Sequence, residues 1–145
     1  MGIQSFLRES NFSTEIDPDG LRQLGWGISR IAFEIQMGEL QGKVLKMARQ
    51  NSTIPENKHE IEVWKHVRGT TVEKYFCPID LPNSDTQNYR YIVMEYAQQH
   101  NTQKGEEMAE KVREATDVNP VDIGGRNIGF YNGTPVFIDY PWGVN

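Results

Sequence analysis

The chain has 145 residues, of which 37% are hydrophobic, a formal net charge of −5 and one cysteine, Cys77. This length suits a single small domain, and the mixed charge lacks the basic patch of a nucleic-acid-binding protein. No apolar run approaches the ~20 residues of a membrane span, and a lone cysteine excludes an intrachain disulfide. We therefore expect neither nucleic acid nor membrane as a partner, and a reducing, cytoplasmic location.

The first half of the chain predicts strands around one helix. Residues 1–20 are typical of a short helix or irregular lead-in that ends in a turn-like Asp-Pro-Asp-Gly sequence. Apolar and polar residues alternate within residues 24–36, as in a strand, and residues 43–48 predict the next strand. Residues 56–68 have helical spacing and follow Pro55, which is a favoured residue in the first turn of a helix.

The second half predicts two further strands, a helix and a hairpin. In chain order these are strands at residues 72–81 and 89–96, a helix at 103–115, and strands at 127–131 and 134–138. Asn132-Gly133, between the last two strands, is the strongest short hairpin signal. Antiparallel strands with one early helix, followed by a helix and a hairpin, predict an α+β fold.

Gly25 and Gly27 form a partial glycine-rich loop. Small residues allow backbone N–H groups to approach phosphate oxygens. Two glycines are also typical of a turn at the entry to a strand, and that alternative stays open. A strand follows here, whereas a dinucleotide-binding unit would place a helix directly after the glycines.

Two lysines compete for the role of an anion-binding group. Lys46 lies between apolar residues of the predicted strand 43–48, where its ammonium group either reaches solvent or points at an anion. Lys43 stands at the start of the strand beside Gly42, where solvent exposure costs little.

A helical wheel separates two glutamates in the middle of the predicted helix. At ~100° per residue, Glu60 falls beside Trp64 and Val67 on the apolar face, and Glu62 falls on the opposite side. A carboxylate on a buried face needs a cationic partner, because an unpaired buried charge is costly. Lys46 is the natural candidate; the alternative is that Glu60 lies at the edge of the face and reaches solvent.

Three oxygen-bearing side chains lie at the two ends of the predicted hairpin. Asp122 stands five residues before Asn127, and Asp139 follows the second strand. Mg²⁺ prefers oxygen ligands and needs only one or two protein groups when phosphate oxygens supply the rest, so Asn127 and Asp139 can converge on one ion. Aspartates at turns are also common caps and turn formers, which is the alternative interpretation.

The order of these features, from the glycines to the last aspartate, resembles the ATP-binding core of the protein-kinase-like superfamily between about residues 24 and 143. The resemblance implies an N-lobe-like antiparallel sheet with one helix, followed by a minimal C-lobe of one helix and a β-hairpin. It implies a single kinase-like domain over residues 1–145, with a lead-in at 1–20, an N-lobe at 21–97 and a C-lobe at 98–145.

The resemblance also implies ATP and Mg²⁺ as cofactors and a role for each candidate residue in the N-lobe. Gly25 and Gly27 would cover the phosphates. Lys46 would touch the α- and β-phosphates, and the family pattern of a lysine between hydrophobic residues favours Lys46 over Lys43. Glu60 would hold Lys46 in place.

Later residues complete the implied site. Residues 91–97 resemble the strand that leads into the adenine-binding hinge, so backbone atoms from Glu95 to Ala97 would hold the base. Asp122 would face the acceptor hydroxyl as the catalytic aspartate, and Asn127 and Asp139 would hold Mg²⁺.

The chain departs from the family pattern in several places. Arg30 replaces the third glycine of the loop, Pro120 stands where kinases often have histidine, and Gly124 stands where they commonly carry a lysine. Tyr140 and Pro141 follow the last aspartate in place of Phe-Gly. No activation segment or later helices are recognisable after Asp139, so we expect the usual acceptor-binding half to be absent. Compact kinase-like proteins of this kind resemble those encoded by viruses of microbes.

Three functional interpretations remain open. The leading one is a miniature kinase-like protein that binds ATP and Mg²⁺ with weak phosphotransfer, which the intact Lys46, Glu60, Asp122, Asn127 and Asp139 favour. The second is a non-catalytic kinase-fold module that binds a protein partner, which the truncation and the altered loop favour. The third is an α+β domain unrelated to kinases.

A partner-binding surface is also expected on the helix at residues 103–115. Met108, Val112 and Ala115 form an apolar stripe on this helix, and few elements remain to cover it. Unless the N-terminal segment, with its apolar residues Ile3, Phe6 and Leu7, folds back over the stripe, we expect self-association or protein docking there.

Overall fold

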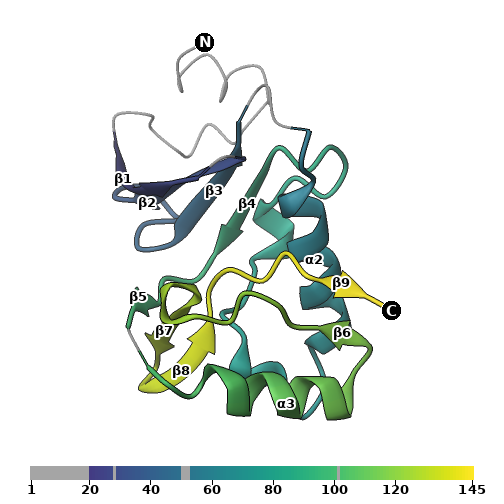
Figure 1. Ribbon diagram of the computed structural model, residues 1–145. Helices are drawn as coiled ribbons and strands as arrows, with labels where there is room; N and C mark the ends of the chain where they lie inside the picture. Colours follow the sequence, from purple (N-terminus) through teal and green to yellow (C-terminus); the bar gives the residue numbers. More distant parts are fainter. Residues whose placement is uncertain (1–19, 28, 50–52, 101) are drawn as a thin grey trace. The chain divides into compact units, whose positions relative to one another are not determined.

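The computed structural model describes residues 20–27, 29–49, 53–100 and 102–145 (Figure 1). The chain divides into two compact units, which are described separately below. Unit 1 comprises Met1–Asn57 and Asp80–Glu95, and unit 2 comprises Lys58–Ile79 and Tyr96–Asn145. The lead-in expected at residues 1–20 lies, apart from Gly20, outside the described residues, as do the apolar residues near the N-terminus.

Unit 1 is built on a four-stranded antiparallel sheet with the order β1-β2-β3-β4 (Figure 1). Its strands are β1 (Leu21–Trp26), β2 (Arg30–Ile35), β3 (Val44–Ala48) and β4 (Tyr91–Met94). The single strand pattern predicted at residues 24–36 therefore divides into the end of β1 and the whole of β2. The division is a tight turn, in which Gly27 N–H donates to the carbonyl of Arg30 at 2.8 Å.

The core of unit 1 packs against one face of this sheet. Its buried residues alternate along the strands, because successive side chains of a strand point to opposite faces. The strand residues of this core are Phe33, Ile35, Leu45, Met47 and Val93, and Leu40 joins them from the connection between β2 and β3. The 3-10 turn η3 (Leu81–Asn83) precedes β4.

Helix α2 (Glu56–Val67) begins in unit 1 and continues in unit 2. It matches the helix predicted at residues 56–68. Ile61, Val63 and Val67 are buried, and so is Glu60, with a relative exposure of 0%. The wheel therefore placed Glu60 correctly on the apolar face, and the alternative of a glutamate reaching solvent is wrong.

Unit 2 combines helices with two small antiparallel sheets. Its helices are the remainder of α2, the 3-10 turns η2 (Glu73–Tyr75) and η4 (Gly125–Asn127), and α3 (Gly105–Ala115). The first sheet has the order β5-β7-β8, from Gln98–Gln99, Ile128–Tyr131 and Thr134–Phe137. The second pairs β6 (Val118–Asn119) with β9 (Gly143–Val144).

The C-terminal hairpin forms as predicted. Strands β7 and β8 pair from Ile128 with Phe137 to Tyr131 with Thr134. Asn132 and Gly133 between them have φ values of 52° and 79°, the left-handed conformation that this short turn needs at both positions. Together with the antiparallel sheet of unit 1, the hairpin confirms the α+β class.

The strand predicted at residues 72–81 is wrong. The segment forms η2, and Phe76 then makes an isolated parallel bridge to Phe137. Pro78 and Pro82 have no N–H to donate to a ladder, which disfavours a regular strand through this stretch. Phe76 and Cys77 are nevertheless buried in the core of unit 2, although the segment forms no regular strand.

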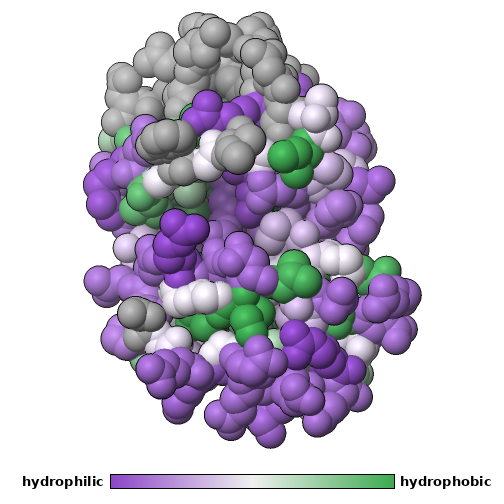
Figure 2. Space-filling view, viewed as in Figure 1, coloured by the Kyte–Doolittle hydropathy of each residue, from purple (hydrophilic) through white to green (hydrophobic). Residues whose placement is uncertain are grey.

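The exposed apolar stripe expected on α3 is not found. Met108 and Val112 are buried at 3% and 0% exposure, and Ala115 is exposed. Met108 and Val112 are thus covered within the chain, so they do not form the exposed apolar face that was expected for docking. In Figure 2 the visible surface is mostly hydrophilic with scattered hydrophobic residues, which is ordinary for a folded protein. No helix in the described ranges is both long and apolar enough to cross a membrane.

Candidate functional site

The predicted site residues lie in both units. Unit 1 holds the two loop glycines, Lys46 and Glu95, and unit 2 holds Glu60, Ala97 and the three residues around the hairpin. Because each unit is described by itself, the expected ion pair between Lys46 and Glu60 and the expected hinge contact with adenine stay predictions.

The glycine turn of unit 1 leaves open space next to its backbone. Gly25 pairs with Ala32 after a bulge in β1. A Cβ atom built on Gly25 would meet nothing within 4 Å, and one on Gly27 would meet only the carbonyl of Arg30 at 3.9 Å. Neither glycine has a positive φ. Packing and backbone conformation therefore do not require glycine at either position.

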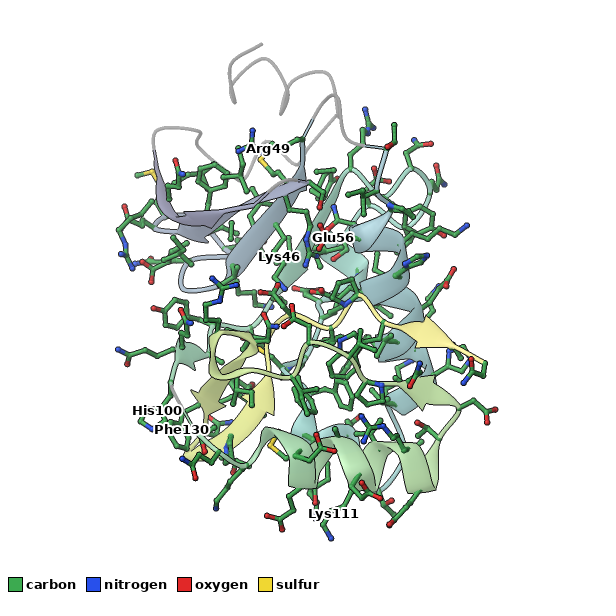
Figure 3. All side chains as sticks on the ribbon, viewed as in Figure 1. Lys46, Arg49, Glu56, His100, Lys111 and Phe130 are labelled. Carbon is green, nitrogen blue, oxygen red and sulfur yellow. The ribbon has the colours of Figure 1, made fainter. Side chains whose placement is uncertain are left out.

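Two arginines that the sequence analysis did not select hold this turn. Arg49, labelled in Figure 3, donates from Nε to the carbonyl of Gly27 at 2.8 Å, and its backbone N–H donates to the carbonyl of Ser29 at 2.7 Å. Arg30 is buried, forms an ion pair with Glu56 at 3.5 Å and donates to Asn57 Oδ1 at 3.2 Å. The residue in place of the third glycine thus connects the turn to the start of α2.

Lys46 lies in the middle of the sheet of unit 1 (Figure 3). It pairs with Ala32 on β2 and with Ile92 on β4, and only 6% of the residue is exposed. A lysine is rarely this buried, because its ammonium group needs an anion or several acceptors. Lys46 is thus the more buried of the two competing lysines, and its role in anion binding stays a prediction.

Lys43, the competitor, already has carboxylate partners. Its Nζ lies 2.7 Å from Asp80 Oδ2 and 3.7 Å from Glu95 Oε1, all within unit 1. The hydrogen bond to Asp80 raises the pKa of Lys43 above its ordinary value, against the opposing effect of burial. Burial would raise the pKa of Asp80, but hydrogen bonds from Lys43 and Asn83 outweigh it, so that pKa is lowered. The side chain of Glu95 therefore belongs to an ion-pair cluster with Lys43 and Asp80. The predicted contact of its backbone with adenine is a separate role.

The pair of Lys43 and Asp80 makes unit 1 sensitive to acid. Because the folded pKa of Asp80 is lowered, its contribution is complete above the unfolded value of about 4 and is lost as pH falls through the folded pKa. We expect Asp80→Asn to cost about 1 kcal/mol of unfolding free energy at neutral pH and clearly less at about pH 3. Urea unfolding of both proteins at the two pH values measures this difference. A cost that does not change with pH would contradict the assignment.

Glu60 holds the backbone next to Asp139. Its Oε2 accepts a hydrogen bond from the N–H of Tyr140 at 3.1 Å, in the buried interior of unit 2. Since Tyr140 directly follows Asp139, this bond from α2 fixes the position of the segment that carries the aspartate. The sequence offered no signal for a contact between residues 80 positions apart.

An aromatic cluster holds the same segment from the other side. Tyr140 is fully buried, its hydroxyl donates to the carbonyl of Cys77 at 2.6 Å, and its ring meets Phe76 edge-on at 5.0 Å. Phe137 and Trp142 complete the cluster, with ring centroids 4.8 Å apart. The departure from Asp-Phe-Gly therefore places a hydrogen-bonded tyrosine in the core directly after Asp139.

The loop from Asp122 to Asn127 is closed by its own side chain. Asn127 Nδ2 donates to the backbone carbonyl of Asp122 at 2.5 Å, and Asn127 N–H donates to the carbonyl of Gly124 at 2.9 Å. Because a carbonyl can only accept, the amide nitrogen of Asn127 must face it, and Oδ1 is the atom left to bind a cation. Asp122 has a φ of 50° and is exposed, so its carboxylate stands at the surface of the loop.

Asn127 also connects this loop to the segment of the last aspartate. Its carbonyl accepts a hydrogen bond from the N–H of Ile138 at 2.8 Å, so Asn127 lies beside the residue that precedes Asp139. Among the residues with a described position, no three His, Cys, Asp or Glu side chains form a metal-binding group. An amide oxygen and a carboxylate are ligand types that suit a hard cation such as Mg²⁺, and the expected convergence of Asn127 and Asp139 on one ion stays a prediction.

Helix α3 positions the loop at two places that the sequence analysis missed. Arg113 Nη2 donates to the carbonyl of Pro120 at 3.2 Å. At the other end of the helix, a Cβ on Gly105 would lie 2.5 Å from the carbonyl oxygen of Ile123, so only glycine allows this approach. A glycine inside a predicted helix was the available signal of close packing; nothing distinguished Arg113 from other surface arginines.

Comparisons with known proteins do not identify a family for this chain. No family model matches the chain, and no curated protein matches it. A solved structure that resembles it is described as the streptomycin-ATP-APH(2″)-IIa ternary complex, at 18% sequence identity and a TM-score of 0.47. The match covers 77% of this chain and 33% of the other, so the chain spans about a third of the length of the protein it matches.

Proposed function

We propose that the chain binds ATP together with Mg²⁺ and supports weak phosphotransfer. The observation that carries the proposal is the double attachment of Asn127, through its side chain to Asp122 and through its backbone to Ile138. In this proposal Asp122 is the candidate proton acceptor, and Asn127 and Asp139 are the candidate Mg²⁺ ligands. Phosphoryl transfer needs such positioned oxygens more than covalent chemistry.

Unit 1 supports the proposal with groups suited to phosphate. The turn with Gly25 and Gly27 leaves its backbone open, and Lys46 is a buried cation on the central strand β3. In the proposed roles the glycines cover the phosphates, Lys46 binds them, and the backbone from Glu95 to Ala97 binds adenine.

Nucleotide binding is the direct test. We expect millimolar ATP with Mg²⁺ to raise the melting temperature of the full chain, since a ligand at a hundredfold above its Kd adds about 2.7 kcal/mol of stability. Asp139→Asn should remove most of the Mg²⁺-dependent part of the shift, and Asp122→Asn should leave the shift but abolish transfer of labelled γ-phosphate. No shift in the wild-type protein would refute the proposal and favour a non-catalytic interaction module.

Glu60 and Glu62 provide a matched pair on one helix. If Glu60 holds Lys46, Glu60→Gln should weaken ATP binding about tenfold, equivalent to about 1.4 kcal/mol. The glutamine oxygen can still accept the hydrogen bond from Tyr140, so the fold should survive. Glu62→Gln, on the more exposed side of α2, should change little. Isothermal titration with ATP and Mg²⁺ measures both, and equal effects would contradict the role of Glu60.

A further inference from the structure

A cavity of about 270 Å³ lies within unit 2, and none of its lining residues belongs to the proposed ATP site. It is formed by η2, the first two turns of α3 and the start of β8. The residues that line it are Lys74, Tyr75, Lys104, Glu107, Met108, Lys111, Thr134 and Pro135. Three lysines and one carboxylate give this lining a positive charge in a chain whose net charge is −5.

Two of the four glutamates of α3 form ion pairs with Arg113 rather than with the lysines of the cavity. Lys104 and Lys111 are seven residues apart, so they lie two turns apart along one face of the helix. Glu106 and Glu110 pair with Arg113, at 3.2 Å and 3.7 Å, and Glu107 is the one carboxylate in the lining of the cavity. Within the part of the chain that the structure describes, none of the three cavity lysines forms an ion pair with a carboxylate.

Apolar side chains also line the cavity. Met108 is 3% exposed, and Tyr75 and Pro135 are partly buried beside it. Lys74 Nζ lies 5.4 Å from the centroid of the Tyr75 ring. Lys104 occupies the N-cap position of α3 and makes no side-chain capping hydrogen bond. The positive end of the helix dipole lies at the same place and adds to the positive charge of the lysines.

We propose that this cavity binds an acidic peptide segment through one apolar side chain flanked by carboxylates. Its volume is below the range of about 300–1,000 Å³ typical of small-molecule sites but sufficient for a single apolar side chain. Lys104 and Lys111 are separated by about 10 Å along the helix axis, a span that an extended peptide can follow with successive carboxylates. Lys111 extends outward from α3, where it can meet such a segment (Figure 3).

The test is an amide NMR titration of the full chain with the peptide Glu-Asp-Leu-Asp-Glu. We expect shifts at η2, α3 and β8, and a loss of binding when glycine replaces the leucine of the peptide. The double variant Lys104→Glu with Lys111→Glu should weaken binding about tenfold, because two favourable charge pairs become repulsive. Lys74→Glu, on a different element, should weaken it about threefold.

The chain offers a control with the same spacing. Lys58 and Lys65 are exposed, seven residues apart on α2 and outside the cavity, so Lys58→Glu with Lys65→Glu applies the same charge change elsewhere. An equal loss in this control would overturn the proposal, because binding would then follow net charge alone. Absence of binding by the wild-type chain, or equally strong binding of acetate or inorganic phosphate at the cavity, would also overturn it.

Discussion

Replacing Tyr140 with alanine should lower the unfolding free energy of the chain by about 3–5 kcal/mol. The residue is fully buried, and its ring packs against Phe76 at 5.0 Å. The substitution removes one ring of the aromatic cluster and leaves the carbonyl of Cys77 without its hydroxyl donor. Urea unfolding followed by tryptophan fluorescence measures the loss, since Trp142 belongs to the same cluster.

A conservative variant separates the ring from the hydroxyl. Tyr140→Phe keeps the aromatic packing and removes only the 2.6 Å hydrogen bond to Cys77, so we expect a loss of about 1–2 kcal/mol. Tyr75→Phe is the matched control, because the described structure gives its hydroxyl no hydrogen-bond partner and the residue is only partly buried. If Tyr140→Ala cost no more than Tyr140→Phe, the packing of the ring would contribute nothing measurable to stability, which would contradict the prediction.

Local signals in the sequence were sufficient for the elements that local interactions determine. The hairpin follows from Asn132 and Gly133, because both adopt the left-handed conformation that the turn requires. The ends of strand β3 and helix α2 were predicted to within one residue. The spacing of apolar residues along the chain differs between a strand and a helix, so it identified both elements. The same spacing identified Glu60 as buried.

Long-range packing determined what the sequence did not reveal. Residues 72–81 have the composition of a strand, yet Phe76 and Cys77 are buried through contacts with the distant Phe137. Likewise Met108 and Val112 are buried within the chain. The number of predicted helices and strands did not reveal that other parts of the chain would cover them. Apolar pattern reports that a residue is buried but not against which partner.

The candidate site shows the same division. The spacing of Asp122 and Asn127 was informative because their contact is local, across five residues. The residues that hold the site in place were missed, among them Arg49 on the glycine turn and Arg113 on Pro120. Both act on backbone carbonyls, and any exposed arginine has the chemistry to do so.

Replacing Lys46 with methionine should abolish the stabilisation by ATP and Mg²⁺, a loss of about 2.7 kcal/mol at a hundredfold above the wild-type Kd. Lys46 is buried on β3 between Ala32 and Ile92, so an unbranched apolar side chain fits its neighbours while removing the charge that the proposed function assigns to phosphate. The variant should still unfold cooperatively, which allows the nucleotide-dependent shift in melting temperature to be measured.

Lys43→Met tests whether the effect belongs to this lysine rather than to positive charge on β3 in general. Lys43 already pairs with Asp80 and Glu95, so its loss should cost about 1 kcal/mol of stability and leave the ATP-dependent shift intact. The opposite pattern, with binding lost in Lys43→Met and retained in Lys46→Met, would assign the phosphate to the start of the strand. Loss of ATP binding in both variants would mean that binding depends on the total positive charge of the sheet. It would then contradict the specific role proposed for Lys46.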